Sequence, residues 1–187
     1  MGEIDVPTLW IEFISTIQEL TNGKAPGING VPPNAFTYMS EENLRHHFDF
    51  ITEFWEDKAD FKEWHEGQVV PVPKSGYLSD PNKWRGFNLM YIGAKVFSSL
   101  ICKRLFKIIK KYGVKYQFGS STGVGCQDGT FTIKTLPHTQ HNHNLLSYAA
   151  FVYPVKEFDT FNHDMMLKAL ERCGDPPKLR SAISRLY

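Results

Sequence analysis

Apolar residues recur three and four positions apart in residues 8–21, 40–57 and 94–111, and this spacing places side chains on one face of a helix. Ser40 is a suitable N-cap for the second helix, because its hydroxyl can accept a hydrogen bond from a backbone N–H of the first turn. Gly23 and Gly113 predict the ends of the first and third helices. The inward faces are expected to be Leu9, Phe13, Ile14, Ile17 and Leu20; then Leu44, Phe48, Ile51, Phe54 and Trp55; then Val96, Phe97, Leu100, Ile101, Leu105, Ile108 and Ile109.

Shorter patterns predict the elements between and after these helices. Pro33 is a suitable first residue for a short helix that runs to residue 39. Residues 68–73 are rich in β-prone valine and predict a strand, which their two prolines confine to a sheet edge or a strand end. Residues 84–90 predict the returning strand after a turn at 74–76. We further expect a glycine-rich loop at 119–129, a helix at 130–136, a short buried strand at 147–152, a helix capped by Asp164 that runs to residue 173, and a last helix introduced by Pro176-Pro177.

The composition is that of a globular protein of the cell interior. Of 187 residues, 42% are hydrophobic and 14% aromatic, which is enough for one domain with a core. No apolar run approaches the roughly 20 residues of a membrane helix, and the acidic N-terminus lacks the layout of a secretory signal. Three widely spaced cysteines suit reduced thiols better than a disulfide framework. We therefore expect a nuclear or cytoplasmic protein without membrane contact, and the sequence sets no oligomeric state.

The net charge of +1 hides a strong asymmetry along the chain. Residues 1–80 carry 14 acidic and 5 basic residues, whereas residues 81–127 carry 9 basic residues and no acidic one. A basic stretch of this kind indicates a surface that meets phosphate groups. An acidic layer packed beside a basic layer would produce the same pattern, so charge alone leaves both interpretations open.

Five segments carry more specific patterns, in a fixed order along the chain. They are NGKAPGINGVP at 22–32, VPVPKSG at 70–76, WRGFNL at 84–89 with Lys95 and Arg104 behind it, QFGSSTG at 117–123, and FVYPVKEFDTFNH at 151–163. Each pattern is weak alone. Together, in this order and spacing, they resemble the motifs of the reverse transcriptases of non-LTR retrotransposons, and the resemblance covers most of the chain from residue 22 onward.

The resemblance implies an α+β fold: the fingers of a right-hand polymerase plus a partial palm, rich in helices, with a short β-hairpin and an incomplete palm sheet. The whole chain, residues 1–187, would then be a partial reverse transcriptase domain. A helical N-terminal part would occupy residues 1–60, the fingers residues 61–146, and the beginning of the palm residues 147–187. The implied partners are an RNA template and a DNA primer.

The resemblance also assigns roles to basic residues. Lys74 and Arg85 match the family's pair that binds the triphosphate of the incoming nucleotide, a task suited to fixed cations on paired strands. Without the family context, two solvated charges on a hairpin would be the simpler interpretation. The residues assigned to nucleic-acid binding are Lys95, Lys103, Arg104, Lys107, Lys110 and Lys111.

The position of the catalytic carboxylate is the main departure from the family pattern. In the family an aspartate at this position holds two Mg²⁺ ions, but here the residue is Tyr153. A phenol with a pKa of about 10 is neutral at pH 7 and is a poor ligand for a hard cation. Glu157 stands where the family has a small alanine, and Asp159 matches a mainly structural aspartate; neither is expected to replace the missing ligand. Asn29 also replaces a usual aspartate.

The family's Y-x-D-D motif does not occur in the sequence either. We therefore expect this chain alone to bind no catalytic Mg²⁺ and to be inactive as a polymerase. Two alternatives remain: a nucleic-acid-binding remnant without catalysis, and a decayed fragment that folds poorly. A zinc site at His138, His141 and His143 is disfavoured because a fourth ligand at structural-site spacing is lacking.

Overall fold

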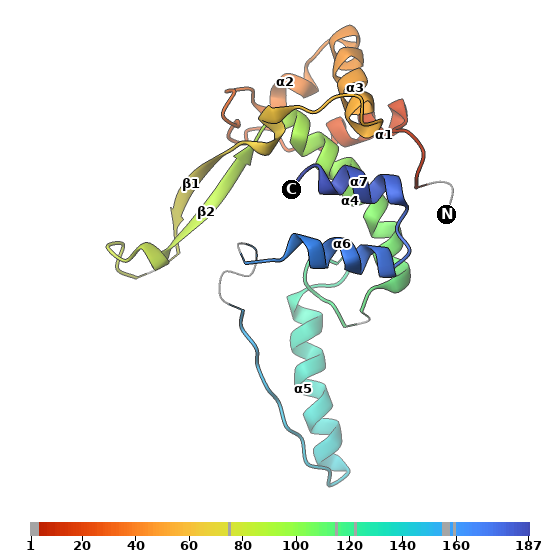
Figure 1. Cartoon of the computed structure of the whole chain (residues 1–187). Coiled ribbons are helices and arrows are strands. Elements are labelled where there is room, and N and C mark those ends of the chain that lie inside the picture. Colours follow the sequence, from red (N-terminus) through yellow and green to blue (C-terminus); the bar gives the residue numbers. More distant parts are fainter. Residues whose placement is uncertain (1–3, 75, 115, 122, 155–157, 159) are drawn as a thin grey trace. The chain divides into compact units, whose positions relative to one another are not determined.

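The computed structural model describes residues 4–74, 76–114, 116–121, 123–154, 158 and 160–187. Its helices and its two-stranded antiparallel sheet agree with the predicted α+β class (Figure 1). The elements are α1 (Trp10–Gln18), α2 (Pro33–Thr37), α3 (Glu41–Trp55), η1 (Lys62–His65), β1 (Gly67–Pro73), η2 (Pro81–Lys83), β2 (Trp84–Met90), α4 (Ile92–Tyr112), α5 (Cys126–Asn142), α6 (His163–Arg172) and α7 (Pro177–Ser184).

The chain divides into two compact units, which we describe separately. Unit 1 comprises residues 1–108 and 163–187, and unit 2 comprises residues 109–162. Unit 1 therefore contains the N-terminal helices, the hairpin, most of α4 and the two C-terminal helices, whereas unit 2 contains α5.

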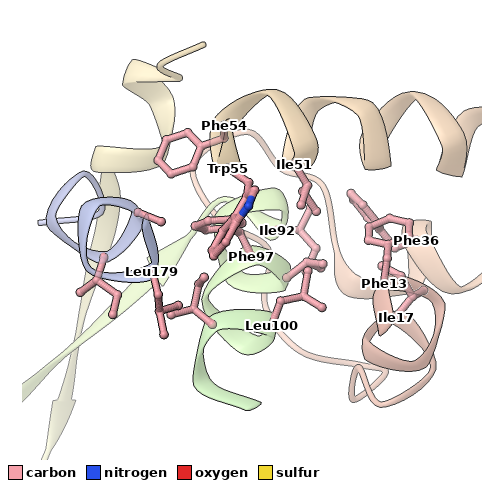
Figure 2. Packing of buried hydrophobic residues seen from close by; sticks show 14 of the residues in the cluster. Phe13, Ile17, Phe36, Ile51, Phe54, Trp55, Ile92, Phe97, Leu100 and Leu179 are labelled. Atoms are coloured by element: carbon pink, nitrogen blue, oxygen red, sulfur yellow. The ribbon is translucent and has the colours of Figure 1, made fainter. Parts of the chain in front are cut away.

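The core of unit 1 is built by α1, α3, α4 and α7, and the apolar residues of α1, α3 and α4 largely follow the predicted helical faces. Phe13, Phe54, Phe97 and Leu179 have no exposed surface (Figure 2). Ser40 caps α3 as predicted, because its hydroxyl accepts a hydrogen bond from the backbone N–H of Asn43. The prediction was wrong for Leu9 and Ile109, which are 54% and 49% exposed. Leu9 precedes the first turn of α1 and is therefore not on the helical face.

The C-terminal helices belong to this core although they lie far from it in the sequence. Arg185 donates a hydrogen bond to the carbonyl oxygen of Phe54 at 2.5 Å and pairs with the carboxylate of Asp57 at 3.1 Å. α7 begins after Pro176, with Pro177 in its first turn, as the sequence predicted. α6 begins at His163, so Asp164 lies in its first turn and is not the cap that the sequence predicted.

The predicted hairpin is present in unit 1. β1 and β2 pair antiparallel, with Val70 opposite Phe87 and Val72 opposite Arg85. The connection is longer than the predicted turn, since the strands end at Pro73 and resume at Trp84. The indole N–H of Trp84 donates to the carbonyl oxygen of Leu78 at 2.9 Å, which ties this connection to the second strand.

Unit 2 differs from the sequence prediction in two places. α5 begins at Cys126 and ends at Asn142, so it takes over the last residues of the predicted loop and exceeds the predicted helix at both ends. The predicted buried strand at 147–152 is wrong, because these residues have no regular secondary structure and are all exposed. In the described part of the chain β1 and β2 pair only with each other, so no strand satisfies the backbone of 147–152.

Candidate functional site

The segment at 22–32 forms a pair of tight turns. The backbone N–H of Gly23 donates to Oδ1 of Asn34 at 2.9 Å, and that of Gly30 donates to the carbonyl oxygen of Gly27 at 3.0 Å. Gly23 and Gly30 both have a φ of 71°, which disfavours residues with a Cβ. Oδ1 of Asn29 accepts from the N–H of Val31 at 3.2 Å, and an aspartate oxygen would do the same. The replacement of the aspartate expected from the resemblance by Asn29 is therefore compatible with this turn.

This loop packs directly against the end of the hairpin. Gly27 is buried, and a Cβ at this position would collide with the backbone carbonyl of Met90. A hollow of about 120 Å³ is lined by the loop, by the first residue of α2, by the end of β2 and by the first turn of α4, with the residues Ala25, Pro26, Gly27, Val31, Pro33, Asn88, Leu89, Met90, Ile92 and Lys95. The structure thus brings together two motif segments that are separate in the sequence: the loop at 22–32, and the strand at 84–89 with Lys95 behind it.

Lys74 and Arg85 lie on one side of the hairpin. Arg85 is opposite Val72, and Lys74 follows Val72 by two residues, so the alternation of side chains along a strand places both cations on the same face. The N–H of Lys74 donates to the carbonyl oxygen of Lys83 at 2.7 Å, which continues the ladder by one pair. Lys83 therefore joins the other two as a third exposed cation.

The sequence interpretation missed Lys83, although the strand register would have revealed it. Once β1 and β2 are aligned, the residue opposite Lys74 is Lys83. We call Lys74, Lys83 and Arg85 the hairpin cations. Asp80 is the nearest carboxylate in the connecting segment, and it accepts from the N–H of Asn82 at 2.9 Å as the cap of η2.

The lysines of α4 differ in how free they are to meet a phosphate. Lys103 donates to Oγ1 of Thr16 at 3.0 Å and to Oε1 of Glu19 at 2.8 Å. The hydrogen bond from Lys103 is the main reason why the pKa of Glu19 lies below its ordinary value. Lys95 is partly buried. The exposed lysines of the helix are Lys107, Lys110 and Lys111.

Arg104 is a structural residue of unit 1 and not part of an exposed basic surface. It is 3% exposed and donates to the carbonyl oxygens of Val6 and Pro7 at 2.7 and 3.3 Å. It also pairs with the carboxylate of Glu12 at 2.8 Å. Burial of Glu12 raises the pKa of that carboxyl, but the hydrogen bonds from Arg104 and from the Leu9 N–H outweigh burial, so the net pKa is lowered. The burial of Arg104 conflicts with its predicted role in nucleic-acid binding.

Tyr153, which the resemblance aligns with a catalytic aspartate, is 90% exposed and lies in a segment without regular secondary structure. Glu157 and Asp159 lie outside the described residues. Within the described ranges, no three His, Cys, Asp or Glu side chains come together to hold a metal ion. A phenol is a poor ligand for a hard cation, so the side chain of Tyr153 does not fit Mg²⁺ and no catalytic step is derived through that ion.

Comparison of the chain with models of known protein families finds no match. Among the described residues, no helix combines the length and the apolar character that crossing a bilayer requires. Because no family model matches, the resemblance to reverse transcriptases rests on the motif residues alone.

Proposed function

We propose that this chain is a reverse transcriptase-like domain of non-LTR retrotransposon type, comprising fingers and the first part of a palm. In this proposal it binds a primer-template through basic residues and does not extend it. The hairpin cations bind the triphosphate of a nucleotide, and the exposed lysines of α4 bind the phosphate backbone.

One observation carries the proposal. Two of the five motif segments, the loop at 22–32 and the strand at 84–89 with Lys95, lie more than 50 residues apart in the sequence and meet around Gly27 and Met90. Unrelated stretches that match family patterns by chance have no reason to pack together. Their packing supports the idea that the motifs were selected as parts of one site.

The absence of catalysis follows from Tyr153. A carboxylate at this position would hold the metal ions that activate the primer hydroxyl, and a neutral phenol does not replace it. The purified chain should give no primer extension above background with Mg²⁺ or Mn²⁺. Extension that depends on added metal and template would refute this part of the proposal.

Binding is tested by fluorescence anisotropy of a labelled RNA–DNA primer-template across a salt series. We expect affinity to fall steeply with salt, because each phosphate contact releases counterions. A plot of log K against log salt has a negative slope. Replacing Lys107, Lys110 and Lys111 by methionine should make this slope shallower by about 3, or about 1 per lost contact.

The matched control replaces three other exposed lysines, Lys62, Lys134 and Lys168, by methionine. It makes the same change in net charge, so it separates a local contact from a general charge effect. Equal losses in the two triple variants would remove α4 from the proposal, and no binding at low salt would end it. A melt without a cooperative transition would instead favour the decayed fragment.

A further inference from the structure

Unit 1 contains a cavity that the proposed function does not use. Its volume is about 360 Å³, which falls within the range of roughly 300–1,000 Å³ typical of small-molecule sites. The lining comes from the loop at 22–32, from α2 and α3, from η1 and from the start of α4. Phe36, Ile51 and Ile92 are among its lining residues and belong to the buried core (Figure 2).

One wall of the cavity is a continuous chain of aromatic rings. His47 lies between Phe36 and Phe50, with ring centroids 4.6 and 6.1 Å away. Phe50 contacts Phe61 edge-on at 5.7 Å, and Phe61 contacts Trp64 at 5.0 Å. Rings in mutual contact keep one another in place and present faces and edges to a planar guest without a large loss of side-chain entropy.

The charge of the site selects against anions. No Asp, Glu, Lys or Arg is among the lining residues. Burial lowers the pKa of His47, aided by the neighbouring His46, so the imidazole is uncharged near pH 7. The segment that carries the aromatic wall, residues 36–64, holds 8 acidic and 3 basic residues. An anion would therefore lose its hydration without gaining a partner and would meet a negative field.

We propose that this cavity binds a neutral, planar aromatic small molecule, held by stacking against the ring wall and oriented by Asn29 and His47. These two residues bring a side-chain amide and an imidazole to an otherwise mostly apolar lining. The acidic surroundings distinguish the site from the basic surfaces proposed to meet nucleic acid. The inference therefore stands apart from the proposed polymerase-like function, and each can fail without the other.

The test uses two probes of nearly the same shape. Indole-3-acetamide is neutral, and indole-3-acetate carries one negative charge. Each is titrated into the full chain labelled with ¹⁵N, and saturable shifts of the backbone amides are followed by NMR. We expect the amide to shift signals of residues 29–31, 47–51 and 91–93, and the acetate to bind at least about tenfold more weakly because its charge has no partner.

Two variants change the cavity in opposite ways: one removes part of its wall and the other fills part of its volume. Phe50→Ala removes a ring of the wall and carries little risk for folding, since Phe50 is already 47% exposed. Val31→Phe adds volume inside the lining. Both should weaken binding of indole-3-acetamide by about tenfold or more. Phe87→Ala is the matched control, because Phe87 is 49% exposed on β2 and does not line the cavity.

Several results would overturn the inference. One is the absence of saturable shifts at millimolar indole-3-acetamide. Another is equal affinity for the acetate and the amide, or unchanged binding in both cavity variants, which would indicate adsorption to exposed apolar surface elsewhere. Tighter binding of N-acetyltryptophanamide than of indole-3-acetamide would identify the site as a receptor for a side chain of a partner protein, and the small-molecule proposal would then be wrong.

Discussion

Units 1 and 2 both contain many aromatic and aliphatic residues, but among the residues that the structure describes only those of unit 1 pack into a core. Phe13, Phe54 and Phe97 in unit 1 have no exposed surface. In unit 2, by contrast, Phe131 is 71% exposed and Leu146 is 84% exposed, and α5 buries no residue at all. A similar supply of apolar side chains therefore has two outcomes.

The spacing of apolar residues explains part of the difference. Phe13 and Ile17 of α1 are four residues apart and share one face, which packs on the core. In α5 Ile133 and Leu136 are three residues apart and share a face, but Phe131, two residues before Ile133, lies on a different side of the helix. A helix buries side chains when they form one stripe and a neighbouring element receives that stripe. The comparison shows that hydrophobic content alone does not make a core.

The largest expected contrast is in hydrogen exchange. Backbone amides of α3 and of the buried part of α4 should exchange only through cooperative opening of unit 1, whereas amides of residues 145–154 lie exposed and outside regular structure. We expect protection factors to differ by about 1,000-fold or more, which corresponds to about 4 kcal/mol. Measurement by mass spectrometry or NMR decides the matter. Equal, low protection in both regions would mean that unit 1 lacks a stable core.

A matched pair of phenylalanine substitutions tests the same contrast through the free energy of unfolding. Phe97→Ala in α4 removes a ring that contacts Phe54 at 4.9 Å and Trp64 at 5.7 Å in the core. It should lower the free energy of unfolding by about 3–5 kcal/mol. Phe131→Ala in α5 removes a mostly exposed ring and should change it by less than about 0.5 kcal/mol. Denaturant unfolding measures both, and similar losses would contradict the division into a packed and an unpacked unit.

Two cations one turn apart on α4 sharpen the comparison between buried and exposed positions. Arg104→Met leaves the carbonyl oxygens of Val6 and Pro7 and the carboxylate of Glu12 without their donor, and it loses the stacking of Arg104 over Trp55 at 4.8 Å. We expect a loss of about 2–4 kcal/mol. Lys107→Met should leave stability nearly unchanged and should instead weaken nucleic-acid binding. The proposal for α4 would be in doubt if Lys107→Met destabilised the fold as strongly.

Local sequence signals predicted the parts of unit 1 that depend on local rules. Ser40 capped α3 because its hydroxyl reaches the first-turn N–H whatever the rest of the chain does. The β-prone valines of residues 68–73 and the turn residues that follow them predicted the hairpin from equally local signals. The three helical faces were predicted well except at Leu9 and Ile109, which lie at the ends of their stripes.

Features that depend on distant partners were not predictable in this way. Arg104 looked like one more cation of a basic helix, and only the fold shows that residues 6–12 wrap around its guanidinium. Residues 147–152 have the composition of a strand, but a strand also needs a neighbour for its backbone, which local composition does not supply. Lys83 could be recognised as the third hairpin cation only once the register of the two strands was known.

The smallest expected effect is on the pH dependence of stability, and it is tested by substituting one histidine in each unit. Burial lowers the pKa of His47 below 6.5, so the folded chain takes up its proton less readily than the unfolded chain. The unfolded state then binds more protons around and below that pH, so stability should fall as the solution is acidified from about pH 7 through 6.5 and on toward the lowered pKa of the folded state. Thermal melts across this range measure the slope, and His47→Leu should flatten it. His138→Gln, on the exposed surface of α5, should leave the slope as it is. A slope that survives in His47→Leu but disappears in His138→Gln would reverse the assignment of burial between the two units.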